Sequence, residues 1–146
     1  SLAVPPEHIV RSDLRIEAGK EAARRLLQTD PRPDAVIATN NFLAVGCIQA
    51  ARSLGLQIPD ELGVVSFDGF SNTVIPEPFL TVVEQPTREM GELAAKILLG
   101  KIPRGGGTDE QNGDAAETNA ESVQRYVFEP TLSVHASTRR KQPARE

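Results

Sequence analysis

The stretch DAVIATNNFLAVGCIQAARSLGLQIPDELGVVSFD, residues 34–68, decides the fold of this chain of 146 residues. Its first part, AVIA at 35–38, is a wholly apolar run after a turn, which is typical of a parallel strand buried on both faces. An amphipathic run to about residue 54 predicts a helix, and LGVVSF at 62–67 predicts a second buried strand. We therefore expect a strand–helix–strand unit in which the two strands are parallel neighbours.

Both ends of the predicted helix carry a local signal. Asn40 stands where its side-chain oxygen can accept a hydrogen bond from a free backbone N–H of the first turn. Gly55 stands where a helix stops with a left-handed residue, and Leu56 follows it to make the usual apolar contact.

The same patterns extend the unit in both directions. Apolar residues at helical spacing predict a helix over 17–29 and another from Pro86 to residue 99, ended by Gly100. Short apolar runs predict further strands at 80–83, 124–128 and 132–134, and residues 8–11 are expected to form a short strand or the approach to one. We predict an α/β fold with a parallel sheet flanked by helices.

Two polar side chains follow the central strands. Asn40 follows the strand at 35–38, and Asp68 follows the strand at 62–67. Ligands of open α/β sheets bind outside the carboxyl ends of the strands, so both residues are candidates for contact with a small polar molecule. Each also has a structural alternative, because Asn40 can cap the helix alone and Asp68 can form an Asx turn before Gly69.

Composition argues for a binding domain and against an enzyme. The chain has no nucleophile motif, no phosphate loop and no metal-ligand spacing, so we expect neither a catalytic residue nor a metal or cofactor. Its net charge of −4 argues against a basic surface that binds nucleic acid. No apolar run approaches the length of about 20 residues that spans a membrane. The single cysteine, Cys47, lies among apolar residues and is expected in the core, as is Met90.

Residues 103–122 differ from the rest of the chain. They hold five acidic residues and almost no large apolar ones, so we expect a disordered acidic insert. The chain also opens on SLAVPPEHIV without Met, which suggests a fragment of a longer protein.

In this order, the motifs resemble the effector-binding region of the lactose-repressor (LacI/GalR) family of bacterial transcription regulators. The resemblance rests on residues 34–70, LTVVEQPTREMGELAAKILLGKI at 80–102, EPTLSVHAST at 129–138 and the helix at 17–27. It implies a periplasmic-binding-protein-like fold in which residues 1–146 form the carboxy-terminal lobe. The helix at 87–99 would belong to the amino-terminal lobe. The chain would cross to that lobe near residues 83–86 and return to the first lobe near 124–130.

The resemblance also implies site residues. Asn40 and Asp68 match positions that bind effector hydroxyls in sugar-responsive members, and Asp13 and Leu14 match a segment that lines the same cleft. Gln85 falls where the chain would cross from one lobe to the other, a position at which the family often has Gln.

Four features depart from the family pattern and leave open an effector that is not a sugar. Asn41 and Gly69 stand where the family has acids, Leu14 stands where it often has an aromatic residue, and His135 stands where it has Arg.

The implied function is effector sensing in a cytoplasmic regulator. A sugar or similar metabolite would close the two lobes, and DNA would be bound only by a helix-turn-helix that is absent from this chain. The resemblance implies a homodimer through Phe42 and Val45 on the helix after Asn40, although these side chains can instead pack under a loop. The alternative is a periplasmic solute-binding protein for transport, with the same fold.

Overall fold

The computed structural model describes residues 4–70, 79–102 and 124–139. Four strands form one sheet in the order β1-β2-β3-β4. β1, β2 and β3 are parallel, and β4 runs antiparallel to β3. The strands are β1 (Ala35–Ala38), β2 (Gly63–Phe67), β3 (Thr81–Glu84) and β4 (Thr131–Ser133). The predicted α/β class is confirmed, although the apolar pattern did not reveal the antiparallel last strand. β1 is an edge strand in which Ile37 is 74% exposed, so the burial on both faces expected for residues 35–38 is wrong.

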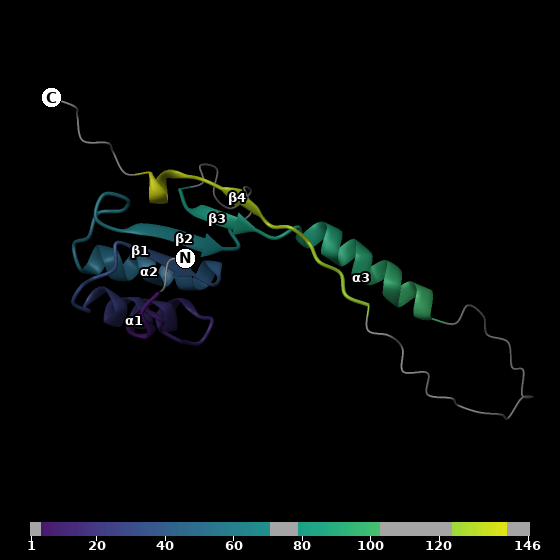
Figure 1. Cartoon of the computed structure of the whole chain (residues 1–146), viewed down its shortest axis with the longest axis horizontal. Helices are drawn as coiled ribbons and strands as arrows, with labels where there is room; N and C mark the ends of the chain where they lie inside the picture. The colour runs from purple at the N-terminus through teal and green to yellow at the C-terminus, as the bar shows by residue number, and fades with distance from the viewer. Residues whose placement is uncertain (1–3, 71–78, 103–123, 140–146) are drawn as a thin grey trace, which may run out of the picture. The chain divides into compact units, whose positions relative to one another are not determined.

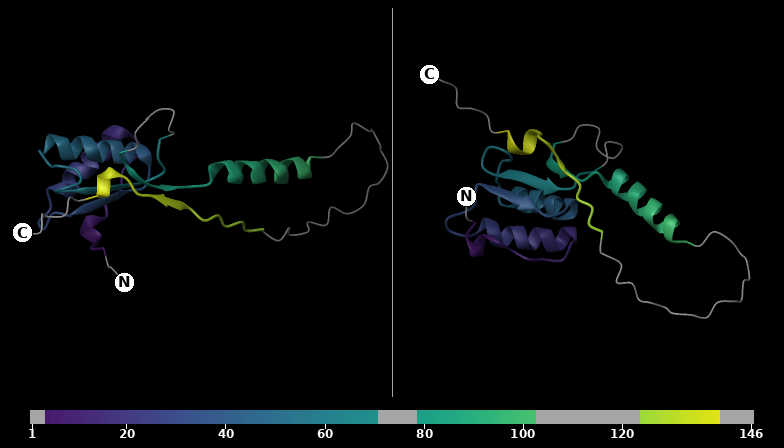
Figure 2. Two further views of the ribbon diagram at one scale, coloured as in Figure 1. Left: turned by 90° about the horizontal axis from the view of Figure 1, so that it is seen from above. Right: turned by 45° about the vertical axis from the view of Figure 1, so that its right-hand side comes forward.

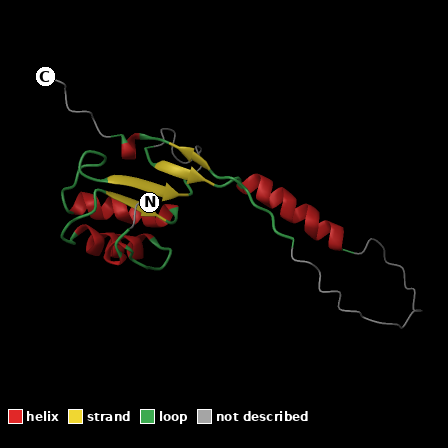
Figure 3. Ribbon diagram, viewed as in Figure 1, coloured by secondary structure: helices red, strands yellow, loops and turns green. Residues whose placement is uncertain are grey.

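Two helices accompany the sheet. Helix α2 (Asn41–Ser53) packs against β1 and β2, and helix α1 (Ile16–Leu27) packs against α2 (Figures 1 and 3). Figure 2 shows from two further directions that the two helices lie side by side. Their buried residues form one core cluster with β2 and the loop before it: Ala23, Leu27, Cys47, Ala50, Ala51, Leu56, Leu62 and Val64.

The ends of α2 are as predicted. The Asn40 side chain accepts a hydrogen bond of 2.9 Å from the Leu43 N–H at the amino end. Gly55 has a φ of 76°, and the Leu56 N–H donates to the Ala51 carbonyl over 2.9 Å. The positive φ of Gly55 and the bond from Leu56 are those of a Schellman motif, and Leu56 is buried beside α2.

The two helices approach each other closely at two glycines. A Cβ atom added to Gly46 would lie 2.4 Å from the Ile16 carbonyl oxygen and 2.5 Å from the Lys20 nitrogen. A Cβ on Gly19 would lie 2.9 Å from the Leu43 Cα. Backbone therefore lies against backbone here, and neither position has room for a side chain.

Residues 86–129 form a second compact unit, separate from residues 1–85 and 130–146. Within it, helix α3 (Thr87–Lys101) has no buried residue among those described, and Met90 is 38% exposed, so the core position expected for Met90 is wrong. The helix also continues through Gly100 instead of ending there. Whether this unit belongs to an amino-terminal lobe stays a prediction.

Two predicted strands are wrong. Residues 8–11 contain no strand, and a 3-10 helix, η1 (Pro6–His8), overlaps their start. Residues 124–128 are also without strand structure. Apolar residues alone do not make a strand, because a strand needs a partner for its hydrogen bonds. The predicted acidic insert at 103–122 lies outside the described residues.

Candidate functional site

Polar residues gather where the parallel strands end. Ala38 pairs with Ser66, and Phe67 pairs with Val83. Asn40 lies two residues after Ala38, and Asp68 lies two residues after Ser66. Because neighbouring strands are about 4.8 Å apart, both residues follow the same edge of the sheet. Gln85 lies two residues beyond Val83. We call Asn40, Asp68 and Gln85 the polar edge of the sheet.

Asp68 and Gln85 are directly bonded. Gln85 Nε2 donates to Asp68 Oδ1 over 3.0 Å and to Oδ2 over 2.9 Å. Both residues are partly buried, so the contact is neither fully screened by water nor closed to a ligand. Among the described residues, the carboxylate makes no hydrogen bond to the backbone two residues on, which an Asx turn would require.

The backbone of Asp68 is held on both sides. Its N–H donates to the Val83 carbonyl over 2.9 Å, and its carbonyl accepts a hydrogen bond of 2.7 Å from Ser66 Oγ. Asp68 has a φ of 65°, in the left-handed region that Asp and Asn tolerate better than most residues. The strand ends in a sharp, fixed turn that aims the carboxylate at Gln85.

Asn40 keeps part of its hydrogen-bonding capacity. Its Oδ1 is used by the helix cap, while its Nδ2 has no partner within the described part of the chain. The amide can therefore cap α2 and still donate to a ligand. The capping role is observed, and the ligand role stays a prediction.

A further contact joins two positions at which the chain departs from the family pattern. Asn41 Nδ2 donates to the Gly69 carbonyl over 3.2 Å, which ties the start of α2 to the loop after β2. A carboxylate at 41 could not donate this bond. A Cβ at Gly69 would lie 3.2 Å from Val82 Cγ1, so a side chain there would be tight. Sequence reasoning noticed both departures, but their pairing was not foreseen.

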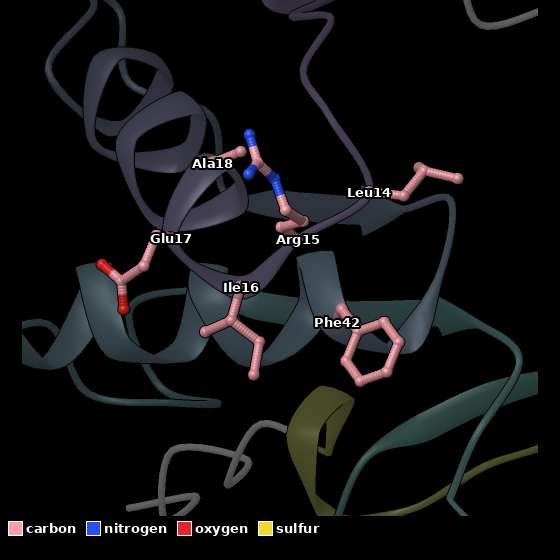
Figure 4. A pocket seen from close by; sticks show the side chains of 6 residues that line it. All are labelled: Leu14, Arg15, Ile16, Glu17, Ala18 and Phe42. Carbon is pink, nitrogen blue, oxygen red and sulfur yellow. The ribbon is translucent and has the colours of Figure 1, made fainter.

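Leu14 and Asp13 lie before α1. Leu14 is 61% exposed and borders an open hollow of about 560 Å³ with the first residues of α1 and with Phe42. Figure 4 shows the side chains of Ile16 and Phe42 extending in the same direction, toward the bottom of the view. The Asp13 carboxylate accepts a hydrogen bond of 2.8 Å from Arg15, and both side chains are exposed. No hydrogen bond joins Asp13 or Leu14 to the polar edge within the described part.

The predicted subunit contact lies beside this hollow. Phe42 is 47% exposed and Val45 is half-buried, both on the first two turns of α2. The exposed ring of Phe42 shows that no described loop covers it fully. The role of this surface in a dimer stays a prediction.

Other candidate chemistry is limited. Burial raises the pKa of the Cys47 thiol to about 11, so the thiol is neutral at physiological pH and behaves as a small apolar side chain. No group of three acidic, His or Cys side chains suited to a metal ion occurs in the described segments. No helix of those segments is long and apolar enough to cross a membrane.

Comparison with known proteins fits this geometry. A family model described as "Periplasmic binding protein-like domain" matches residues 2–128. The ribose operon repressor of Halalkalibacterium halodurans is 34% identical over 66% of this chain and 29% of its own length. The transcriptional repressor CytR of Escherichia coli K12 is 34% identical over 69% of this chain and 30% of its own length. The chain therefore spans about 30% of the length of these relatives.

Solved structures agree. The transcriptional regulator CelR in complex with cellobiose is 28% identical and superposes with a TM-score of 0.68, covering 92% of this chain and 37% of that protein. The chain belongs to the periplasmic binding protein-like domain family, and within it resembles part of the effector-binding region of LacI-family transcription regulators.

Proposed function

We propose that this chain is the carboxy-terminal part of the effector-binding region of a bacterial transcription regulator, and that a sugar or similar polar metabolite binds at its polar edge. The observation that carries the proposal is the Asp68–Gln85 pair, fixed at the carboxyl edge of parallel strands beside Asn40. This is the place at which open α/β sheets bind ligands.

The polar edge offers both hydrogen-bond acceptors and a donor. The Asp68 carboxylate keeps lone pairs that Gln85 does not occupy, and the Gln85 amide oxygen is a second acceptor. Asn40 Nδ2 is a donor. A hydroxyl group donates one hydrogen bond and accepts others, so neighbouring hydroxyls on a ring match this mixture.

The apolar hollow complements the edge. Leu14 presents apolar surface before the amino end of α1, as the face of a sugar ring requires. Asp13 is carried by the same segment as Leu14 and would add a carboxylate when the segment lies against a ligand. Leu14 offers no aromatic ring for stacking and would contact a ligand only with its aliphatic side chain.

The regulatory scheme follows from the relatives, which are repressors. Effector binding would close the carboxy-terminal lobe on an amino-terminal lobe that includes the helix at 87–99. Closure would change DNA binding by a helix-turn-helix outside this chain, in a cytoplasmic homodimer joined through Phe42 and Val45. The division of the chain after Gln85 and before Pro130 supports two crossings between lobes.

Calorimetry on the intact regulator with ribose and cellobiose tests the proposal. Asp68→Asn keeps the shape of the side chain and its tolerance of positive φ but removes the charge. We expect at least about tenfold weaker binding, the size of a lost charge-assisted hydrogen bond. Asp60→Asn, on an exposed loop, is the matched control and should bind normally. Equal affinities of the two variants would remove Asp68 from the site, and the absence of binding heat with both sugars would exclude ribose and cellobiose as effectors.

A further inference from the structure

The two connections between the compact units continue a single pair of strands. The chain leaves the first unit after Gln85 and re-enters it at Pro130. Glu84, the last residue of β3, and Thr131, the first residue of β4, are register partners in an antiparallel pair. Both connections therefore emerge from the same end of one two-stranded ribbon, which we call the β3–β4 ribbon.

This ribbon runs further than its pairing with β2. The register between β2 and β3 ends at Phe67 and Val83, whereas β3 and β4 remain paired one residue further. The Asp68 N–H donates to the Val83 carbonyl over 2.9 Å at this last point of the pairing. Beyond it the ribbon has two strands only, and a two-stranded ribbon is marginally stable by itself. The end of the ribbon is therefore the part of the sheet with the weakest backbone support.

Gln85 attaches this end to the strand beside it. Its Nε2 lies 3.0 Å and 2.9 Å from the two carboxylate oxygens of Asp68. Among the described residues, this contact alone links the ribbon beyond Val83 to the end of β2 by a side-chain hydrogen bond. The near-equal distances place Nε2 between the two oxygens, so that both share one N–H of the amide in a three-centre bond. The acceptor is a carboxylate, and charge-assisted bonds are stronger than neutral ones.

The carboxylate is carried by a backbone that belongs to β2. The Asp68 carbonyl accepts a hydrogen bond of 2.7 Å from Ser66 Oγ, and the residue has a φ of 65° in the turn that ends the strand. Asp68 is therefore held by its own strand, whereas Gln85 is the last residue before the chain leaves the unit. A bond between them joins a fixed point to the start of a connection.

We infer that Gln85 is a positioning residue that clasps the connection between the two units to Asp68: the carboxylate of Asp68, through the Gln85 amide, holds the end of the β3–β4 ribbon in place. The polar edge and the connection thus share one carboxylate. A ligand group that draws this carboxylate away from Gln85 loosens the connection. The inference rests on the proposed function only in treating Asp68 as a ligand residue.

Nuclear magnetic resonance of the 146-residue chain without ligand tests the clasp. Gln85→Met keeps the length of the side chain and removes the donor. We expect the backbone order parameters at residues 85 and 87 to fall from about 0.85, the value of rigid backbone, toward about 0.6, the value of flexible backbone. Asp68→Asn keeps the shape of the acceptor and removes its charge, so it should lower the same order parameters by less. The Asp68 backbone N–H should stay rigid in Gln85→Met.

The combined variant distinguishes a clasp from two separate structural roles. If both residues act through one bond, Gln85→Met with Asp68→Asn should be no more mobile at residues 85 and 87 than Gln85→Met alone. Gln28→Met and Asp60→Asn are the matched controls, because they make the same changes at exposed positions, and they should leave these order parameters unchanged. Unchanged order parameters in folded Gln85→Met, or effects that add in the combined variant, would overturn the inference.

A measurement on the unmodified chain covers the case in which the variants do not fold. Only one hydrogen of the Gln85 amide can point between the oxygens, so its two side-chain resonances should be further apart than those of free glutamine. The bonded hydrogen should exchange about tenfold more slowly than the other, the factor expected for one hydrogen bond. Two resonances at the positions of free glutamine would overturn the clasp. None of these readouts contains a ligand, so a failure of ribose and cellobiose to bind would contradict the proposed sugar effector alone.

Discussion

Gln85 Nε2 lies 3.0 Å and 2.9 Å from the two carboxylate oxygens of Asp68, although 16 residues separate the two positions in the chain. The pair joins the end of β2 to the residue after β3, the last before the second unit begins. Its geometry is fixed by the backbone of Asp68 on one side and by the length of β3 on the other.

A double-mutant cycle measures this contact. Gln85→Ala removes the donor, and Asp68→Ala removes the acceptor. We expect a coupling of about 1 kcal/mol in the free energy of unfolding, because both residues are partly buried and the bond is charge-assisted. Additive effects of the two changes in denaturant titrations would show that the bond does not persist in solution.

Asn40 allows capping to be separated from ligand contact. Asn40→Ala should cost about 1 kcal/mol of stability, because the Leu43 N–H loses its acceptor. Asn40→Asp keeps an oxygen acceptor and should keep that stability, but it lacks the amide donor. If Asn40→Asp binds the effector as tightly as the unchanged protein in calorimetry, Asn40 is only a cap.

The contact between α1 and α2 predicts a sharp contrast between two glycines. Gly46→Ala should lower the free energy of unfolding by about 2 kcal/mol or more, since its Cβ would overlap the backbone of α1. Gly91 lies on α3, and a Cβ atom added there would have no atom within 4 Å. Gly91→Ala should leave the free energy of unfolding of the α1–α2 unit unchanged and should raise the helix content of α3. Thermal unfolding followed by circular dichroism compares them. A Gly46→Ala variant of normal stability would contradict the close backbone approach.

Cys47 predicts how stability depends on pH. The folded chain holds the thiol proton up to a pKa of about 11, whereas the unfolded chain releases it near 9.0. Between these values the unfolded state binds fewer protons, so the free energy of unfolding falls as pH rises, by up to about 2 kcal/mol. Cys47→Ala lacks this contribution. Its stability should therefore decline less than that of the unchanged protein between pH 9 and 11, and parallel curves would show that the thiolate is tolerated.

The parts of the fold that sequence reasoning found are those with local causes. The strand at 35–38 has the predicted bounds, and α2 has its cap at Asn40 and its stop at Gly55, because each signal lies within a few residues of its effect. The predicted stop at Gly100 was wrong, since a glycine ends a helix only where the chain turns left-handed.

The errors and omissions have non-local causes. Whether residues 8–11 form a strand depends on a neighbouring strand and not on their own apolar character. Asp68 and Asn40 are candidates because of their places after strands, but the bond from Gln85 to Asp68 depends on the register of β2 and β3. The hydrogen bonds of the buried Ser137 hydroxyl are further still from prediction, because no local pattern marks a serine whose partners lie 56 and 73 residues away.

The dimer surface carries the last prediction. Phe42 is 47% exposed and Val45 is half-buried on one side of α2, whereas the opposite side of the helix meets the sheet. If this surface meets its symmetry mate, Val45→Asp places like charges close to each other across the two-fold axis and removes them from water, which strongly opposes association.

The intact protein carrying Val45→Asp should therefore sediment as a folded monomer. Arg52→Gln is the matched control, because it changes the net charge by the same amount on the exposed end of the same helix. It should leave the dimer intact. Circular dichroism of both variants separates dissociation from unfolding. A Val45→Asp dimer of undiminished affinity would place the subunit contact elsewhere and leave Phe42 as the apolar wall of the hollow beside Leu14, a role that requires no second subunit.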